Sequence, residues 1–174
     1  MKIEPIEIKD KLGRTIVLRN AIPDDANDLI RYLEVISAET PYLIREPDEI
    51  TITYEQEVSF INNCLTSNKS LMLIATLNGK HIGNCSLSPI GSYKRYSHRC
   101  EFCGYGIGKS MLENVLEVAK GLGFEQAELE VISDNRNTIA LYEKLGFKKY
   151  GSFPDNMKYA NGEYASADWM MKKL

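Results

Sequence analysis

The chain has 174 residues, of which 44% are hydrophobic and 26% are charged, and its formal net charge is −3. This length and composition predict one globular domain over residues 1–174 with a full hydrophobic core. The small negative charge gives no general attraction to nucleic acid or to anionic membranes. No apolar run is long enough to cross a bilayer, and the polar first ten residues are not a signal peptide, so we expect a cytoplasmic protein.

The first part of the chain predicts two strands, a helix and a long loop. Alternating isoleucines indicate a strand pair over residues 3–8 and 14–20. Apolar side chains at helical spacing then follow Pro23 and predict a first helix as far as Ile36. Residues 37–51 contain two prolines and no sustained period, so they form a loop that could be a substrate wall.

The next part predicts a second helix and a hairpin. Thr53 begins the helix, and Gln56 completes a capping box with it. Two apolar segments, residues 71–77 and 81–87, read as strands. An Asn-Gly dipeptide at 78–79 joins them, which is typical of a tight two-residue hairpin turn.

The second half of the chain alternates strand and helix patterns. The predicted elements are a strand within 93–102, a helix over 111–122, a strand over 126–131, a helix over 135–145, and strands over 148–153 and 164–174. This order predicts an α+β fold with a mixed, mostly antiparallel sheet. It also contains one β-α-β-α unit.

The four cysteines favour neither a metal site nor a disulfide. Cys100 and Cys103 have the C-x-x-C spacing, which raises a redox or zinc hypothesis. Zinc needs further ligands, and the sequence offers no second cysteine pair and only two histidines, His81 and His98. We therefore predict no bound metal and four buried free thiols in a reducing compartment.

The stretch CGYGIGKSM, residues 103–111, lies between a predicted strand and a predicted helix. It misses the nucleotide-triphosphate pattern G-x-x-x-x-G-K-[ST], because Cys103 occupies the first glycine position. It also differs from the dinucleotide pattern G-x-G-x-x-G. A glycine loop that enters a helix directs backbone N–H groups and the helix dipole at an anion. The stretch therefore predicts an anion site, or alternatively a simple glycine-rich turn.

A second segment, DNRNTIALYEKLGF at residues 134–147, indicates what the glycine stretch belongs to. Together the two segments resemble the GNAT superfamily of N-acetyltransferases, whose loop pattern R/Q-x-x-G-x-G/A is matched by Gly106 and Gly108. The family pattern N-x-x-A-x-x-L-Y-x-K-x-G-F is matched, with Thr138 in the alanine position, by Asn135, Leu141, Tyr142, Lys144, Gly146 and Phe147. The resemblance implies a GNAT-type fold with about four helices around the sheet, and an enzyme that uses acetyl-CoA.

The resemblance also implies roles for individual residues. The backbone N–H groups from Tyr105 to Ser110 would hold the pyrophosphate of coenzyme A, Asn135 would contact the pantetheine arm, and Tyr142 would protonate the leaving thiolate. Glu101, on the strand that enters the site, is our candidate general base. The expected cofactor-binding set is Cys103, Gly104, Tyr105, Gly106, Ile107, Gly108, Lys109, Ser110, Asn135 and Tyr142. Structural alternatives stay open: a helix N-cap for Asn135, a core aromatic for Tyr142 and a solvated glutamate for Glu101.

Two features depart from the family pattern. Cys103 stands where arginine or glutamine is usual, which removes a side-chain donor. Roughly eight residues, which the family uses for a bulged strand segment, are absent between Phe102 and Cys103. Either the deletion is real and the sheet splays or ends beside Phe102, or residues 93–102 are re-registered to replace it. Re-registration would place polar side chains in a core strand, which is costly.

The acceptor is expected to be a primary amine. The order of elements is similar to that of the ribosomal-protein and polyamine branches of the superfamily, which implies a protein N-terminus, a polyamine or another small amine. Acidic residues at 46, 48 and 49 could attract a cation. We expect no nucleic acid or membrane partner, and a homodimer is left open. A different class of function, a non-catalytic coenzyme A binding or regulatory module, applies if the strand is truncated.

Overall fold

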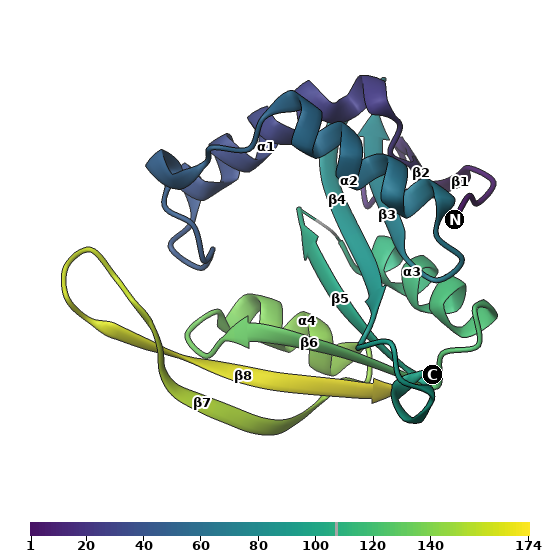
Figure 1. Cartoon of the computed structure of the whole chain (residues 1–174). Coiled ribbons are helices and arrows are strands. Elements are labelled where there is room, and N and C mark those ends of the chain that lie inside the picture. The colour runs from purple at the N-terminus through teal and green to yellow at the C-terminus, as the bar shows by residue number, and fades with distance from the viewer. Residues whose placement is uncertain (107) are drawn as a thin grey trace.

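Eight strands form one sheet in the order β1-β2-β3-β4-β5-β6-β8-β7 (Figure 1). The computed structural model describes residues 1–106 and 108–174. The strands are β1 (Ile6–Lys9), β2 (Thr15–Asn20), β3 (Leu71–Leu77), β4 (Lys80–Pro89), β5 (Arg99–Tyr105), β6 (Gln126–Ile132), β7 (Lys148–Lys158) and β8 (Tyr164–Lys173). Neighbouring strands are antiparallel except β5 and β6, which run parallel. The predicted mixed, mostly antiparallel sheet is confirmed.

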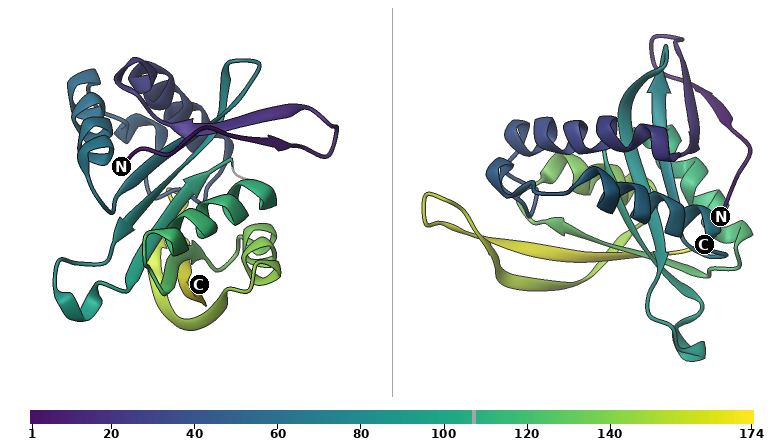
Figure 2. Two further views of the ribbon diagram at one scale, coloured as in Figure 1. Left: turned by 90° about the vertical axis from the view of Figure 1, so that its right-hand side faces the viewer. Right: turned by 45° about the horizontal axis from the view of Figure 1, so that its top comes forward.

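In the described residues, four α-helices cover the two faces of the sheet (Figure 2). They are α1 (Ala26–Glu39), α2 (Tyr54–Thr66), α3 (Lys109–Gly121) and α4 (Arg136–Lys144). The α1 and α2 helices pack on one face, and α3 and α4 pack on the other. In the part of the chain that the structure describes, no helix combines the length and the apolar character needed to span a membrane.

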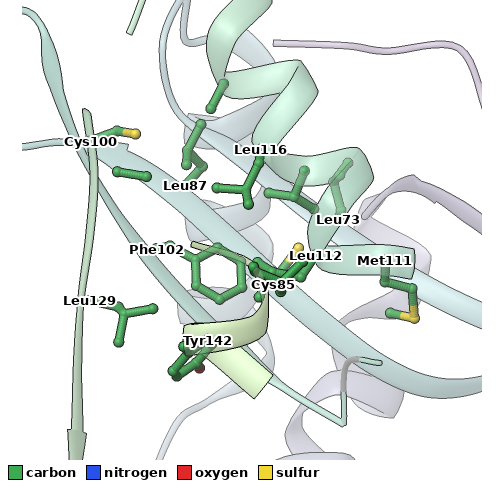
Figure 3. Packing of buried hydrophobic residues seen from close by; sticks show 14 of the residues in the cluster. Leu73, Cys85, Leu87, Cys100, Phe102, Met111, Leu112, Leu116, Leu129 and Tyr142 are labelled. Atoms are coloured by element: carbon green, nitrogen blue, oxygen red, sulfur yellow. The ribbon is translucent and has the colours of Figure 1, made fainter. Parts of the chain in front are cut away.

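The β3 strand packs against helices on both faces of the sheet. Its residues from Leu71 to Thr76 are all buried, and successive side chains point to opposite faces. Met72 and Ile74 pack with α1 and α2, whereas Leu73 belongs to the larger cluster on the α3 side. In that larger cluster, Leu112 and Leu116 of α3 point toward the sheet (Figure 3). The β3 strand is therefore almost continuously apolar, because neither of its faces is exposed to solvent.

Two local predictions hold in detail. The Thr53 hydroxyl accepts a hydrogen bond from the Gln56 backbone N–H, and the Gln56 side-chain oxygen accepts one from the Thr53 N–H, so the capping box begins α2 as expected. At the predicted hairpin, Asn78 and Gly79 have φ angles of 51° and 77°. Two successive positive φ angles are the geometry of a tight turn between antiparallel strands.

The β5 strand differs from the prediction. It begins at Arg99 rather than Tyr93, because residues 94–96 form a short 3₁₀ helix, so the re-registered strand over 93–102 is wrong. The strand also does not end at Phe102, since its pairing with β4 continues to the pair Asn84 and Tyr105. Residues 103–105, which were expected in the glycine loop, therefore belong to β5. Whether the sequence carries a deletion relative to its family stays a prediction.

The sheet opens between β5 and β6. Their parallel pairing covers three positions, from Arg99 opposite Gln126 to Glu101 opposite Glu128. Beyond this point β5 continues to Tyr105 beside β4, and β6 continues beside β8, so the two strands diverge (Figure 1). The predicted splaying of the sheet is therefore present, and it begins just before Phe102.

Candidate active site

A cleft of about 640 Å³ occupies the opening between β5 and β6. Alternation along β5 places Phe102 and Gly104 on the face covered by α3 and α4, and Glu101 and Cys103 on the other face. All four residues line the cleft, together with residues of α4 and of the loop after α1. The cleft therefore passes through the sheet and connects its two faces.

Most of the predicted site residues meet in this cleft. Its walls include Glu101, Cys103, Gly104, Tyr105, Gly106, Asn135 and Tyr142. The remaining cofactor candidates Gly108, Lys109 and Ser110 form the beginning of α3 instead. Ile107, also predicted to bind the cofactor, lies outside the described residues. The cleft thus joins the three segments on which the prediction depended: the strand, the glycine stretch and α4.

The beginning of α3 is suited to an anion. Gly108 is the N-cap residue, and no side chain caps the helix. Its first turn has no acidic residue and begins with Lys109, whereas the first turn of α2 has two glutamates and a threonine cap. The first backbone N–H groups of a helix have no partner within the helix, and their positive dipole end favours negative charge. A Cβ on Gly108 would meet no atom within 4 Å, so this end is open.

The residues Cys103, Gly104 and Tyr105 do not belong to a loop, contrary to the prediction. They continue β5 in register with Ser86, Cys85 and Asn84 of β4. Their proposed contact with the cofactor stays a prediction, but it would come from a strand wall, and the candidate pyrophosphate loop is shortened to residues 106–110.

The thiols also differ from expectation at one position. Cys64, Cys85 and Cys100 are buried and free, as predicted, whereas Cys103 is free and exposed. Cys100 and Cys103 are three residues apart on a strand, so their side chains point to opposite faces and cannot act as a pair. The Cys103 thiol instead donates a hydrogen bond to the Tyr105 hydroxyl at 3.5 Å. Burial, followed by the charge effect of Cys103, raises the pKa of Tyr105.

Gly106 is constrained by a neighbour that the sequence did not reveal. Its φ angle is +66°, and a Cβ placed on it would lie 2.0 Å from the Tyr32 hydroxyl oxygen and 2.7 Å from the Ile82 carbonyl oxygen. The Tyr32 hydroxyl donates a hydrogen bond to that carbonyl at 3.1 Å. Glycine at 106 is therefore required by packing against α1 and β4. No local pattern pairs Tyr32 with a glycine so distant in the sequence.

Tyr142 is both a core residue and a cleft residue. It is 8% exposed and lies in the large buried cluster (Figure 3). Its ring contacts the ring of Phe147, with centroids 5.7 Å apart. Burial raises the pKa of Tyr142 to about 12, with a smaller contribution from Cys103. Among the hydrogen bonds of the described residues, none involves its hydroxyl. A phenol that remains protonated and faces a cleft can donate a proton.

Asn135 both caps a helix and lies in the wall of the cleft. Its side-chain oxygen accepts a hydrogen bond from the Thr138 N–H at 3.3 Å and so caps α4. The same residue lines the cleft. The helix N-cap expected as the structural alternative for Asn135 is therefore present, and its contact with the pantetheine arm stays a prediction.

The side of the cleft away from α4 is acidic. Glu39, Glu101 and Glu130 line it, and no lysine or arginine is found in the described part of its wall. Arg99, two residues before Glu101 on the same strand, is already held by Glu128 through two hydrogen bonds of 2.5 and 2.7 Å. Glu101 lies beside this pair in the sheet and makes no ion pair with the described residues. The arrangement favours a positively charged ligand on this side.

Comparison with known proteins agrees with this geometry. Residues 32–147 match the model of the "Acetyltransferase (GNAT) family", which is more than half of the chain. The chain belongs to the GNAT family. The expectation that it is a transferase of this family is thereby confirmed.

The individual proteins that match this GNAT chain share low sequence identity with it. A structure titled as a GNAT-family acetyltransferase from Streptococcus pneumoniae is 28% identical, with a TM-score of 0.85 over 91% of this chain and 99% of that one. A GNAT superfamily phosphinothricin acetyltransferase from Sinorhizobium meliloti, solved with AcCoA, is 21% identical with a TM-score of 0.77, covering 91% and 88% of the two chains.

A curated Bacillus subtilis (strain 168) protein, "Putative phosphinothricin acetyltransferase YwnH", is 33% identical over 51 residues. Those residues are 29% of this chain and 31% of that protein, so the match covers less than a third of the relative's length.

Proposed function

We propose that this GNAT protein is an acetyl-CoA-dependent N-acetyltransferase that transfers the acetyl group directly to a primary amine. The observation that carries the proposal is the cleft through the sheet. It brings Tyr142, from the helix on one face, and Glu101, from the other face, to the same space. A cofactor can enter from one face and an acceptor from the other.

The residues of the first face fit coenzyme A. The open beginning of α3 offers Gly108, Lys109 and Ser110 to the pyrophosphate, without a competing side-chain cap or an acidic first turn. Asn135 and the wall of β5 would line the path of the pantetheine arm. The cofactor supplies the acetyl group as a thioester. The protein therefore has to align that thioester with the amine and move protons.

Proton transfer on the acceptor side falls to Glu101. A primary amine with a pKa near 10.4 is neutral in about one molecule in 2,500 at pH 7, so a proton must be removed before the nitrogen can attack. Glu101 is exposed in the cleft, makes no ion pair among the described residues, and has two further carboxylates near it on the same wall. These carboxylates attract the ammonium form, and Glu101 is the group we assign to accept its proton.

Proton transfer on the cofactor side falls to Tyr142. Its raised pKa, about 12, keeps the phenol protonated at neutral pH. When the amine nitrogen bonds to the acetyl carbon, the carbon–sulfur bond breaks and the thiolate needs a proton. Tyr142 would donate it and recover one from solvent. Since a thiol pKa is near 8.5, the thiolate is already a tolerable leaving group and this help is moderate.

Binding and turnover experiments separate this proposal from its alternatives. Coenzyme A and acetyl-CoA should raise the melting temperature, whereas ATP with magnesium and NAD should not. Release of free thiol should then depend on an added amine, tested with a peptide N-terminus, a polyamine and simple amines. Stabilisation by ATP with magnesium but not by coenzyme A would contradict the assignment. Cofactor binding with no transfer to any amine would select the non-catalytic coenzyme A module.

The setting in the cell is also part of the proposal. We place the protein in the reducing cytoplasm, which the three buried free thiols at Cys64, Cys85 and Cys100 support.

A further inference from the structure

Cys103 is a nucleophile in the cleft that the proposed mechanism does not use. It lies on β5 in the wall of the cleft, and its thiol is exposed, whereas the other three thiols are buried. A cysteine reacts as the thiolate, and only where a reagent can reach the sulfur. Accessibility therefore separates Cys103 from the other cysteines, and the contents of the cleft decide what it meets.

No other cysteine of the chain is placed to form a disulfide with Cys103. The sequence contains four cysteines. Cys85 and Cys100 belong to the buried cluster on the α3 side of the sheet (Figure 3), whereas Cys103 points to the opposite face. Cys64 is 5% exposed and lies in the separate cluster under α1 and α2. A disulfide of Cys103 therefore needs a sulfur from outside the chain.

A second side chain of the cleft indicates where that sulfur comes from. Tyr142 is 8% exposed and lines the same cleft, and within the described structure its hydroxyl has no hydrogen-bond partner. Burial, and then the charge effect of Cys103, raises the pKa of Tyr142 to about 12. Since charge effects fall with distance, the phenol and the thiol are near each other. The proposed function places the cofactor sulfur at the Tyr142 hydroxyl, and hence close to Cys103.

Tyr105 holds the Cys103 sulfur in the wall of the cleft. The thiol donates a hydrogen bond to the Tyr105 hydroxyl oxygen at 3.5 Å. Burial, with a further effect of Cys103, raises the pKa of Tyr105, so the phenol keeps its proton at neutral pH. A hydroxyl can accept or donate, so it can donate to the sulfur once the thiol has lost its own proton. The contact can thus persist in the reactive thiolate form.

We propose that Cys103 is a modification site for coenzyme A, where coenzyme A disulfide forms a mixed disulfide with the protein. The Cys103 thiolate attacks one sulfur of coenzyme A disulfide, so a bond from Sγ to that sulfur forms and the sulfur–sulfur bond of the reagent breaks. The other coenzyme A leaves as a thiolate with the electron pair and takes up a proton from water. The reagent is the oxidant, since Cys103 is oxidised and one coenzyme A is reduced.

The inference rests on the proposed function, because it assumes that the cleft holds coenzyme A. It adds regulation of the same site. A coenzyme A molecule linked to Cys103 occupies the cleft and excludes acetyl-CoA, so transfer stops until a reductant breaks the disulfide. Under reducing conditions the thiol stays free. The oxidation state of the coenzyme A pool would therefore control the enzyme.

The test compares coenzyme A disulfide with glutathione disulfide as reagents for the parent protein. Both oxidise thiols, but the open start of α3 can hold one half of coenzyme A disulfide and raise its local concentration at Cys103. Fragmentation mass spectrometry, which separates Cys103 from Cys100, follows the adduct. We expect coenzyme A disulfide to react at least about 10-fold faster. Saturating acetyl-CoA should block this reaction, and dithiothreitol should remove the adduct and restore turnover.

Three variants separate recognition from simple accessibility. Gly108→Asp, which places a carboxylate at the N-cap of α3, should slow the reaction of coenzyme A disulfide and leave that of glutathione disulfide unchanged. Cys103→Ser should form no adduct, and its turnover after treatment with coenzyme A disulfide should equal its own turnover before treatment. Cys64→Ala, a change at a buried thiol, is the matched control and should be modified and inactivated like the parent.

The outcomes distinguish the inference from the function beneath it. Equal rates for the two disulfides, or an adduct at Cys103 that leaves turnover intact, would overturn the inference. Stabilisation of the protein by acetyl-CoA without any adduct from coenzyme A disulfide would also overturn it, and would leave the acetyltransferase proposal standing. Absence of stabilisation by acetyl-CoA in thermal unfolding would overturn the proposed function itself.

Discussion

Replacing Gly108 with aspartate should have opposite effects on the stability of the free protein and on its affinity for coenzyme A. Gly108 has an extended backbone at the N-cap of α3, with φ −83° and ψ 172°. An added Cβ would meet no atom within 4 Å, so aspartate fits without strain. It would cap free N–H groups and add a negative charge at the positive end of the helix dipole.

The gain in stability can be worked from these two effects. Aspartate is better than glycine at an N-cap by a few tenths of a kcal/mol, and its charge adds about 0.3–1 kcal/mol. The free energy of unfolding should therefore rise by about 0.5–1 kcal/mol. For a chain of this size, this corresponds to an increase in melting temperature of about 1–4 °C.

The loss in affinity follows from the same carboxylate. It would occupy the N–H group of Ser110 or Met111, near the place that we assign to the pyrophosphate. Two unit charges 4 Å apart at a protein surface interact with about 4 kcal/mol. Screening by salt and movement of the side chain reduce this repulsion. We expect the dissociation constant of coenzyme A to rise about 100-fold, which corresponds to about 2.7 kcal/mol.

Calorimetric titration with coenzyme A and thermal unfolding of the free protein measure the two effects. Gly121→Asp is the matched control, because it makes the same substitution at the opposite end of α3, where a Cβ also meets no atom within 4 Å. It should leave the affinity for coenzyme A unchanged. Parent-like affinity in Gly108→Asp would refute the anion site, and a lowered melting temperature would refute the capping argument.

Three further changes test other parts of the site. Tyr142→Phe should lower kcat about 100-fold with little change in cofactor affinity, because the ring is kept and the proton donor is lost; parent-like turnover with rate-limiting chemistry would exclude Tyr142 as the acid. Gly106→Ala should lower the free energy of unfolding by about 2–3 kcal/mol, since it strains a left-handed backbone and displaces the Tyr32 hydroxyl; an unchanged melting temperature would contradict the packing. Glu128→Gln should cost about 2 kcal/mol at pH 7. Its hydrogen bonds with Arg99 lower the pKa of Glu128 from 4.5, so this stabilisation is present above pH 4.5 and lost as the pH falls further. The difference in melting temperature between parent and Glu128→Gln should shrink in acid, and a constant difference would refute the ion pair.

Local chemistry made much of the fold predictable. The capping box at Thr53 and the Asn78-Gly79 turn depend on neighbours two or three residues away, so the sequence pattern contains the whole signal. The limits of β5 were not predictable in this way. The partner of Tyr105 is Asn84 on another strand, and the glycines at 104 and 106 suggested a loop to which Gly104 does not belong.

The site was predictable as a set of residues more than as a geometry. The family pattern named Asn135 and Tyr142, and both line the cleft. Tyr32 was missed, because its contacts with Ile82 and Gly106 join a helix to a distant strand and leave no periodic or local trace in the sequence. A glycine was expected at position 106 because a ligand needs access to the backbone there. The structure adds a second reason, since a side chain at 106 would collide with the Tyr32 hydroxyl and the Ile82 carbonyl.

Protection of Cys103 is the measurement that tests the central claim most directly, namely that acetyl-CoA occupies the cleft through the sheet. Cys103 is the exposed thiol among the four cysteines, and it lines the cleft. Its alkylation by N-ethylmaleimide, followed by mass spectrometry of the peptide, should be rapid in the free protein. Saturating acetyl-CoA should slow it at least about 10-fold, while ATP should have no effect. Equal rates of Cys103 alkylation with and without acetyl-CoA would contradict the account.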